Sequence, residues 1–502
     1  MNNLISTWQT HQPQFWQALL EHIQISLISL FLAILVAVPL ALLLRRFAKV
    51  AELVLQVTGI FQTIPSLALL GLLIPIVGIG SVPAVIALVV YAVFPILQTT
   101  YTGLQQIDPS LTEAATAFGM NRRERLMKYE LALAMPFIMA GIRTATVMII
   151  GTATLAALIG AGGLGNFILL GINQNDVSLI LIGAISSAVL AVIFSFVLRR
   201  LEKARIRTIL ISFFIGLLLL LGSFYRPGTE QRTITIGGKL GSEPTILINM
   251  YEELIEADSN IEVNLKANFG DTTFCYNALK SDKIDLYPEY SGTILTTFLK
   301  KNPTSSTRPS TVWRAARDEI SKQENLTYLS PMKFQDTYAL AVKSDFAQKN
   351  HLENISDLAK VQSGIKAGFD LEFANRTDGY KGLQSLYGLD FTVSTMQTSL
   401  IYNALNSDAV NLAQIYSTDS QIRQYKLSIL KDDRQLFPPY QAAPLVKPAL
   451  LKKYPELRKI LNKLSGKITD AQMIQMNYEV NVKQKSPASV ARAFLKSENL
   501  LD

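Results

Sequence analysis

The sequence contains very little cysteine and histidine. Of its 502 residues, one is a cysteine, Cys275, and three are histidines, His11, His22 and His351. A single cysteine cannot form an internal disulfide bond, and a zinc site needs a cluster of cysteine and histidine ligands. Because the histidines lie in different regions, the sequence excludes a disulfide-stabilised fold and predicts no metal site.

The chain also lacks the motifs of a nucleotide-hydrolysing enzyme. No G-x-x-x-x-G-K-[ST] phosphate loop occurs, and Gly466-Lys467-Ile468 lacks both the preceding glycine and the hydroxyl that would hold magnesium. No catalytic Ser-His-Asp set can be assembled either. We therefore predict that the chain is not an enzyme and binds no cofactor itself.

Long apolar runs are frequent early in the chain and missing from the rest of it. Five or six stretches before Arg226 are long enough to cross a hydrocarbon core of ~30 Å. They are 24–44, 53–74, 84–101, 136–158, 177–198 and 208–225. The predicted domains are a transmembrane domain at 1–207, an additional transmembrane helix and linker at 208–232, and a water-facing domain at 233–502.

Basic residues before Arg226 fall in three clusters, which alternate with loops free of Lys and Arg. The clusters lie at 45–49, 122–143 and 199–207, and the loops at 75–83 and 161–176. Since cytoplasmic loops are enriched in Lys and Arg, the clusters are predicted to lie inside and residues 227–502 outside. The net charge of +8 is thus partly a topology signal, and no nucleic-acid partner is expected.

One predicted cytoplasmic segment carries a family pattern. It reads Glu113-Ala114-Ala115-Thr116-Ala117-Phe118-Gly119, followed by a basic cluster and then Glu130-Leu131-Ala132-Leu133-Ala134-Met135-Pro136. The segment resembles the EAA loop of ABC-importer permeases, whose small-residue helix pair docks into a groove on a separate ATPase. Small Ala114, Ala115 and Gly119 would allow close approach, and Glu113 would set the register. The alternative is an ordinary amphipathic helix with an acidic start and a basic end.

This resemblance implies partners for the chain. Energy would come from an ATPase subunit in trans, which would use ATP and Mg²⁺. A five-helix importer core needs two copies to enclose a pathway, so a homodimer in the lipid bilayer is expected. A membrane-anchored receptor that signals through the inner loops is the alternative of another class, although all of the predicted cytoplasmic segments are short.

Residues 233–502 alternate between strand-like and helical patterns. Strands are predicted at 233–238, 261–266, 284–287, 337–343 and 365–369, and helices at 245–256, 272–280, 311–323, 355–361, 397–405, 447–464, 469–480 and 487–498. This order is typical of α/β units with parallel sheets.

Four short stretches in this domain resemble the substrate-binding proteins of the quaternary-amine (osmoprotectant) uptake family. They are 284–293 (IDLYPEYSGT), 335–342 (QDTYALAV), 415–419 (IYSTD) and 437–445 (FPPYQAAPL). With the EAA loop, the resemblance covers essentially the whole chain. It implies an all-α polytopic membrane domain, of the type I ABC-importer permease class, fused to an extracellular α/β domain with the two-lobed type II periplasmic-binding-protein fold. Such a domain closes on its ligand by hinge bending.

In that family an aromatic cage surrounds the methylated ammonium group of the ligand. The matching positions here are Tyr290, Tyr338, Tyr416 and Tyr440. A quaternary ammonium group cannot donate a hydrogen bond, so ring faces attract it, at about 0.5–2 kcal/mol each when desolvated. Any one of these tyrosines could equally be a core ring with its hydroxyl satisfied. The four family positions together favour the cage.

Other residues could hold the polar end of the ligand. Thr293 matches a family position that can hydrogen-bond it, and Arg376 is a candidate carboxylate clamp. The threonine could equally cap a helix. The arginine could equally hold Glu372 or Asp378 in a structural ion pair.

The loop Gly241-Ser242-Glu243-Pro244-Thr245 departs from betaine- and choline-binding members, which usually have a Glu-Gln pair. Its Glu-Pro resembles the fused ergothioneine importers of Gram-positive bacteria. Ergothioneine, a trimethylated histidine betaine with a thione ring, would need extra room and acceptors such as Glu243 or Asp419. We therefore expect import of a small trimethylammonium compound, ergothioneine ahead of glycine betaine, carnitine or choline, through the plasma membrane of a Gram-positive bacterium. Alternatively, Pro244 only stiffens the start of a helix.

Overall fold

The computed structural model describes residues 2–174, 176–202, 204, 206–223, 232–299 and 308–501. Internal contacts divide the chain into two compact units. One, the membrane unit, contains Met1–Gly171 and Val177–Thr229. The other, the binding unit, contains Glu230–Asp502 together with the short segment Ile172–Asp176. Most of the predicted linker, together with Lys203 and Arg205 of the third basic cluster, lies outside the described residues.

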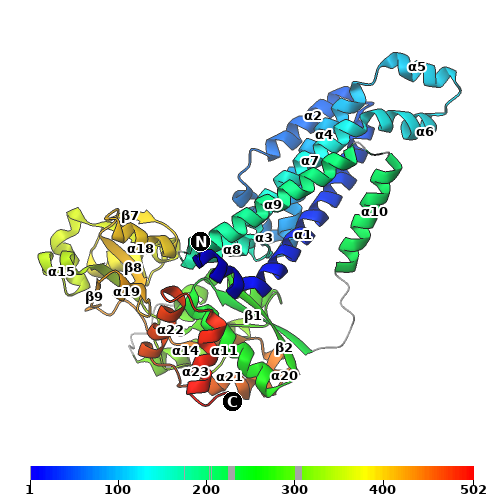
Figure 1. Cartoon of the computed structure of the whole chain (residues 1–502). Helices are drawn as coiled ribbons and strands as arrows, with labels where there is room; N and C mark the ends of the chain where they lie inside the picture. Colours follow the sequence, from blue (N-terminus) through cyan, green and yellow to red (C-terminus); the bar gives the residue numbers. More distant parts are fainter. Residues whose placement is uncertain are drawn as a thin grey trace. The chain divides into compact units, whose positions relative to one another are not determined.

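The described part of the membrane unit is helical (Figure 1). Its helices are α1 (Asn2–Leu44), α2 (Ala48–Phe61), α3 (Ser66–Val77), α4 (Ser81–Gln105), α5 (Pro109–Ala117), α6 (Arg122–Arg125), η1 (Leu126–Glu130), α7 (Leu131–Ala153), η2 (Thr154–Ile159), α8 (Gly165–Gln174), α9 (Val177–Glu202) and α10 (Ile206–Ser223). Four stretches are long and apolar enough to cross a membrane, namely Gln14–Leu44, Ser81–Gln105, Leu131–Ile159 and Val177–Glu202. They coincide with four of the predicted spans.

The predicted span at 53–74 is not a straight helix. It is divided between α2 and α3, whose axes differ in direction by 91°. Pro65 lies directly before α3, and a proline at this point cannot continue the hydrogen-bond ladder of the preceding helix. With this pair taken as one broken span, the described helices provide up to five spans. The last predicted span corresponds to α10, whose apolar stretch Arg207–Leu218 is shorter.

Helices α1, α4, α7 and α9 lie side by side, and α5 and α6 project from one end of this bundle (Figure 1). Small residues permit the close packing. A Cβ atom added to Gly141 of α7 would lie 2.0 Å from the Thr99 hydroxyl of α4. Outward-facing side chains such as Leu35, Val192 and Phe196 are exposed and apolar, as expected of helices that face lipid.

The binding unit has two lobes, each built on a five-stranded sheet (Figure 1). The first lobe contains the sheet β2-β1-β3-β10-β4 and the second lobe the sheet β7-β6-β8-β5-β9. The strands are β1 (Arg232–Lys239), β2 (Ile261–Gly270), β3 (Leu286–Tyr290), β4 (Thr327–Tyr328), β5 (Tyr338–Lys343), β6 (Lys366–Phe369), β7 (Thr392–Thr395), β8 (Leu412–Tyr416), β9 (Leu427–Leu430) and β10 (Ala442–Val446).

Both sheets are mixed, which corrects the prediction of parallel sheets. Strand β1 runs parallel to β2 and β3, and β6 runs parallel to β7 and β8. In contrast, β10 is antiparallel to β3 and β4, and β5 is antiparallel to β8 and β9. Parallel neighbours need a crossover connection on the same sheet. Because β5 and β10 each enter their sheet from the other lobe, this constraint does not apply to them.

The helices of the binding unit follow the predicted order. They are α11 (Ser242–Asp258), α12 (Thr272–Lys280), α13 (Ser291–Thr293), η3 (Ile294–Phe298), α14 (Pro309–Glu324), α15 (Ser344–Asn350), η4 (Ile355–Gly364), α16 (Leu371–Asn375), α17 (Tyr380–Gly382), η5 (Leu383–Tyr387), α18 (Thr398–Asn406), α19 (Gln421–Gln424), α20 (Pro448–Lys453), α21 (Glu456–Leu461), η6 (Asn462–Leu464), α22 (Asp470–Asn481) and α23 (Pro487–Ser497). The helix predicted at 447–464 is instead divided into α20, α21 and η6, and Pro455 lies at the break between α20 and α21.

The chain passes between the lobes twice, from β4 to β5 and from β9 to β10. The two passages pair with each other, since the Asp336 N–H donates to the Tyr440 carbonyl at 3.1 Å and Gln335 bridges Gln441. Two paired crossing segments form a hinge about which two lobes can open and close. The predicted site residues lie close to this hinge.

Candidate functional site

Strand register brings two of the predicted cage residues together in the second lobe. Tyr338 of β5 lies directly opposite Tyr416 of β8 in the antiparallel pair. Directly opposed residues present their side chains on the same face of a sheet. Their ring centroids are 5.2 Å apart. Tyr338 is buried and Tyr416 is half-buried.

Tyr440 reaches this pair from the hinge. Its ring lies edge-on to that of Tyr338, with centroids 5.7 Å apart. Gly292, two residues after β3, leaves space for Tyr440, because a Cβ atom there would lie 2.6 Å from its ring. Phe373 and Phe437 complete the group at 5.0 and 6.3 Å from Tyr338. We call Tyr338, Tyr416, Tyr440, Phe373 and Phe437 the aromatic cluster. The sequence did not single out Phe437 as a site residue, although one of the family stretches begins with it.

Tyr290, the fourth predicted cage residue, is held differently. It ends β3, and its hydroxyl donates to Glu243 Oε1 at 2.6 Å. The Lys239 ammonium group lies 5.2 Å from its ring centroid and pairs with the fully buried Glu289. Tyr290 thus joins the site through the first lobe, where it is buried and faces a cation of the protein's own.

Arg376 forms ion pairs with both Asp378 and Glu372. These are the structural pairs that the sequence offered as the alternative to a carboxylate clamp for the ligand. Its guanidinium group donates to Asp378 at 2.7 and 2.8 Å and to Glu372 at 2.8 Å. It also donates to Thr296 of η3 at 2.7 Å and to Tyr440 at 3.1 Å. Arg376 follows α16 of the second lobe, whereas Thr296 belongs to the first, so the arginine connects the two lobes.

The Arg376–Asp378 pair is buried and tightly bonded. Burial opposes ionisation of Asp378, but hydrogen bonds from Arg376 and Tyr440 outweigh it and lower the pKa of this carboxyl below its usual value. The guanidinium carbon also lies 5.4 Å from the Tyr338 ring centroid. A positive charge therefore already borders the aromatic cluster on this side.

Three carboxyl groups lie together on the other side of the site. Glu243, at the start of α11, and Asp336, in the hinge, both contact the Thr418 hydroxyl at 2.7 Å. Asp419 accepts hydrogen bonds from the Tyr402 hydroxyl and from the Tyr416 N–H. Burial raises the pKa of Glu243 to about 7 and that of Asp419 to about 6. Neither Asp336 nor Thr418 was singled out from the sequence.

Thr293 and Pro244, which the sequence analysis also singled out, both lie in helices of the first lobe. Thr293 ends the short helix α13 that follows Tyr290, and it is buried. Pro244 is buried in the first turn of α11, where a proline fits because its missing N–H would have no intrahelical partner. This position agrees with a helix-stiffening role and leaves its influence on the ligand untested.

The predicted EAA loop forms two short helices. Glu113, Ala114 and Ala115 lie on α5, which Asp108 caps by accepting from the Ser110 N–H. Gly119 follows α5 with φ of 78°, a backbone conformation that favours glycine. Glu113 and Ala114 are exposed, Ala115 is buried, and Phe118 is 86% exposed. The exposed face of α5 therefore combines small, acidic and aromatic side chains.

An ion-pair network that the sequence did not predict fixes the base of this loop. Glu130, 2% exposed, accepts two hydrogen bonds from Arg45, which directly follows α1, and one from Arg125 of α6 at 3.1 Å. Arg125 also donates to Thr116 of α5 at 2.9 Å. The network thus connects α5, α6 and the start of α7 to the end of α1.

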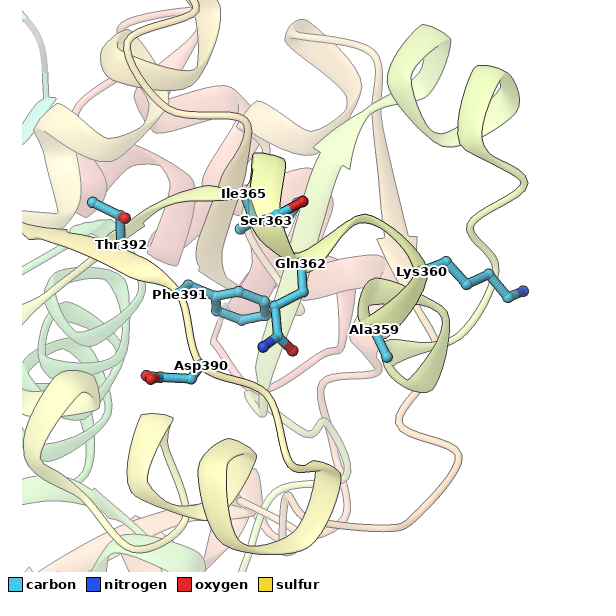
Figure 2. A pocket seen from close by; sticks show the side chains of 8 residues that line it. All are labelled: Ala359, Lys360, Gln362, Ser363, Ile365, Asp390, Phe391 and Thr392. Atoms are coloured by element: carbon cyan, nitrogen blue, oxygen red, sulfur yellow. The ribbon is translucent and has the colours of Figure 1, made fainter.

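The binding unit also has an open surface hollow of about 610 Å³ in its second lobe (Figure 2). Figure 2 shows the Phe391 ring next to Gln362, with the Lys360 ammonium group pointing away. The lining residues are Ala359, Lys360, Gln362, Ser363, Ile365, Asp390, Phe391 and Thr392. None of the predicted ligand residues is among them, so this hollow is separate from the aromatic cluster.

Comparison with known proteins agrees with this two-unit arrangement. Residues 232–497 match the substrate-binding domain of ABC-type glycine betaine transport systems, and residues 29–207 match the inner-membrane component of binding-protein-dependent transport systems. The chain belongs to this ABC importer family. It joins the permease and the substrate-binding domain of the family in one polypeptide, as its sequence predicted.

Similar proteins carry both or either of these parts. The ergothioneine transport permease/ergothioneine binding protein EgtU of Helicobacter pylori (strain G27) is 34% identical, over 89% of this chain and 84% of that protein. The carnitine transport binding protein OpuCC of Listeria monocytogenes serotype 1/2a (strain 10403S) is 35% identical, over 55% of this chain and 90% of that protein. The choline transport system permease protein OpuBB of Bacillus subtilis (strain 168) is 43% identical, over 40% of this chain and 94% of that protein.

Membership of the family decides between the two classes of function considered from the sequence. The chain is a membrane protein of an ABC importer, the first of these classes. Importers of this kind depend on an ATPase subunit and take up a small molecule, so the ATPase partner predicted in trans follows from the family.

Proposed function

We propose that this chain captures and imports a small trimethylammonium compound. The observation that carries the proposal is the aromatic cluster, in which rings from three separate segments converge on Tyr338 beside the hinge. Aromatic faces attract a quaternary ammonium group without requiring a proton from it. Burial raises the pKa of Tyr338, Tyr416 and Tyr440 well above the usual value, so their hydroxyls stay neutral and cannot attract metal cations as phenolates would.

Ergothioneine is the first candidate for the ligand. The similarity to the Helicobacter pylori protein, which is named for ergothioneine, extends over both units of the chain. Glu243-Pro244 at the start of α11 and the acceptor Asp419 support the same choice, since a thione ring needs both space and polar partners. Glycine betaine, carnitine and choline are the alternatives, because relatives of the separate units are named for carnitine and choline.

The partners and the orientation follow from the same proposal. The exposed face of α5, with Glu113, Ala114 and Phe118, docks on an ATPase subunit that uses ATP and Mg²⁺, while Ala115 packs inward. Two copies of the chain enclose the pathway. In this proposal α5 and α6 lie in the cytoplasm and the binding unit lies outside the plasma membrane, an orientation that the basic residues at the ends of the spans support. The tether holds the binding unit near the pore at an effective concentration on the order of millimolar.

Calorimetric titration of the full-length chain in lipid nanodiscs tests the ligand class. The four compounds are titrated separately, together with the carbon isostere of glycine betaine in which a tert-butyl group replaces the trimethylammonium group. We expect one or more of the four to bind. The isostere, which keeps the carboxylate but lacks the positive charge, should bind far more weakly. Binding of ergothioneine alone supports the first candidate, and binding of betaine or choline alone supports the alternative. Equal binding of the isostere would contradict recognition by cation–π attraction.

A further inference from the structure

Thr418, like Arg376, connects the two lobes of the binding unit through its side chain. Thr418 follows β8 of the second lobe and is 2% exposed. Its Oγ1 atom lies 2.7 Å from Glu243 Oε2 of the first lobe and 2.7 Å from Asp336 Oδ1 in the hinge. We call these three residues the Glu243–Thr418–Asp336 bridge. It lies beside the aromatic cluster, because Asp336 and Thr418 are each two residues from a cluster member, Tyr338 and Tyr416. The other oxygen of Glu243 accepts from Tyr290.

The bridge needs a proton in addition to the one on the threonine. A hydroxyl group carries one proton and can donate it to one carboxylate only. Each of the two O···O contacts is 2.7 Å long, the length of a good O–H···O hydrogen bond, so the second contact requires a donor on the carboxyl side. Tyr290 does not supply this proton, since its hydroxyl already donates to the opposite oxygen of Glu243. Glu243 and Asp336 therefore share one proton.

The surroundings favour this protonated state. Burial raises the pKa of Glu243 to about 7 and raises that of Asp336 well above its usual value. The Glu243 carboxyl also raises the pKa of Asp336, as a like charge in one site does, and Asp419 raises the pKa of both. Tyr402 faces Asp419 through its hydroxyl. The nearby cation, Lys239, is paired with Glu289.

The backbone of the same residue takes part in a second connection between the lobes. The Thr418 carbonyl accepts from the Asn477 side chain of α22 at 3.1 Å, and Asn477 in turn accepts from the Ser242 hydroxyl at 3.0 Å. Ser242 begins α11, next to Glu243. When Thr418 meets the first lobe, both connections can therefore form together.

We propose that Thr418 is a positioning residue for closure of the lobes on the ligand, and that the Glu243–Thr418–Asp336 bridge takes up one proton as it forms. This inference rests on the proposed function, because closure serves ligand capture. None of these hydrogen bonds joins Thr418 to the aromatic rings. Thr418 therefore affects ligand binding indirectly, by stabilising the closed state in which the rings contact the ligand.

The sign of the pH dependence follows from proton linkage. In the open binding unit Glu243 of the first lobe is separated from Thr418 and Asp336, so both carboxyls titrate nearer their ordinary range, and closure raises the pKa of the pair. The closed state binds more protons than the open one, so closure is favoured at low pH and weakens as the pH rises toward about 7. If closure takes up one proton, the Kd of the ligand rises by up to tenfold for each unit of pH, between the ordinary carboxyl range and about pH 7.

The test uses the full-length chain in nanodiscs, with ergothioneine and glycine betaine as probes. Titrations from about pH 5 to about pH 8, each in two buffers of different ionisation enthalpy, count the protons taken up. The wild type is expected to approach one proton. Thr418→Val, which removes the hydroxyl and keeps the shape, is expected to lose the uptake and release ligand about tenfold faster, the change that loss of ~1.4 kcal/mol produces. Thr418→Ser is expected to restore both.

Two further variants distinguish the role of the bridge from the effect that any substitution near the site has on ligand binding. Asp336→Asn supplies an amide donor to Thr418 in place of the shared proton, so proton uptake is expected to disappear although the bridge can still form. Thr398→Val is the matched control, because Thr398 bonds Asp370 at 3.4 Å within the second lobe only. It is expected to retain the wild-type proton uptake.

Ligand binding without proton uptake in the wild type, or unchanged release from Thr418→Val, would overturn the inference and leave the proposed function in place. If neither probe binds, carnitine and choline are titrated in the same way, and failure of all four compounds to bind would contradict the proposed function. With a compound that binds, infrared spectroscopy of the ligand-bound chain gives a second measure of the bridge. A protonated-carboxyl band at neutral pH that is lost in Asp336→Asn would support the bridge, and a spectrum with no such band would overturn it.

Discussion

Replacement of Tyr416 by alanine removes one ring from the aromatic cluster with little effect on the core. Tyr416 is half-buried at the end of β8, whereas its neighbour Tyr338 is buried at the centre of the cluster. Loss of Tyr338 would also leave a cavity, which costs about 3–5 kcal/mol of stability for a large buried ring. Tyr416 is therefore the better probe of ligand recognition.

The size of the expected effect follows from the contact that is lost. A desolvated ring contributes about 0.5–2 kcal/mol to holding a quaternary ammonium group. Since 1.4 kcal/mol is a tenfold change in affinity, Tyr416→Ala should raise the Kd by about 2-fold to 30-fold. The 5.2 Å spacing from Tyr338 supports the upper part of this interval, because the two rings would enclose the cation together.

Calorimetry on the full-length chain measures the change, with Tyr425→Ala as the matched control. Tyr425 is a half-buried tyrosine of the same lobe that stacks on Tyr402 at 6.2 Å, outside the cluster. The control should bind ligand like the wild type. The reasoning would be refuted if Tyr416→Ala bound with wild-type affinity, or if both variants weakened binding equally.

Three other substitutions test further parts of the structure. Gly292→Ala places a Cβ atom 2.6 Å from the Tyr440 ring, so the ring must move. The free energy of ligand binding, measured by calorimetry, should weaken by about 1–3 kcal/mol. Unchanged binding would show that Tyr440 is not held at this position. Glu130→Ala leaves Arg45 and Arg125 without their shared carboxylate and should cost about 3 kcal/mol, seen as a lower melting temperature of the solubilised chain; an unchanged transition would mean that the network is dispensable. Gly119→Ala strains a residue at φ of 78° by ~1 kcal/mol and should reduce ATP-driven uptake more than ligand binding; equal uptake would argue against docking by this loop.

Local signals in the sequence predicted many elements of the binding unit. The helix predicted at 272–280 has its observed bounds, and the Asp271 side chain directly before it caps it by accepting from the Phe274 N–H. The length of the apolar runs was sufficient to predict the four long spans. It was not sufficient to predict the shape of the span at 53–74, where both α2 and α3 are apolar and only Pro65 marks the break between them.

The geometry of the site depends on long-range pairing that no local pattern specifies. Tyr338 and Tyr416 are neighbours because β5 and β8 pair in one register, and the sequence gives no sign of that register. The residues singled out include most of the aromatic cluster, since short family stretches contain them. Thr418 and Asp336 lie in the same stretches but were missed, because their role arises only when the two lobes meet.

The central claim is that this single chain both captures a trimethylammonium compound and carries it through the membrane with an ATPase. Uptake of radiolabelled ergothioneine, glycine betaine, carnitine and choline into proteoliposomes that contain the chain and its ATPase subunit tests this claim most directly. We predict accumulation of one of them that requires ATP and the ATPase and that weakens in Tyr416→Ala. Accumulation that is independent of ATP, or the absence of accumulation of any trimethylammonium compound, would contradict the account.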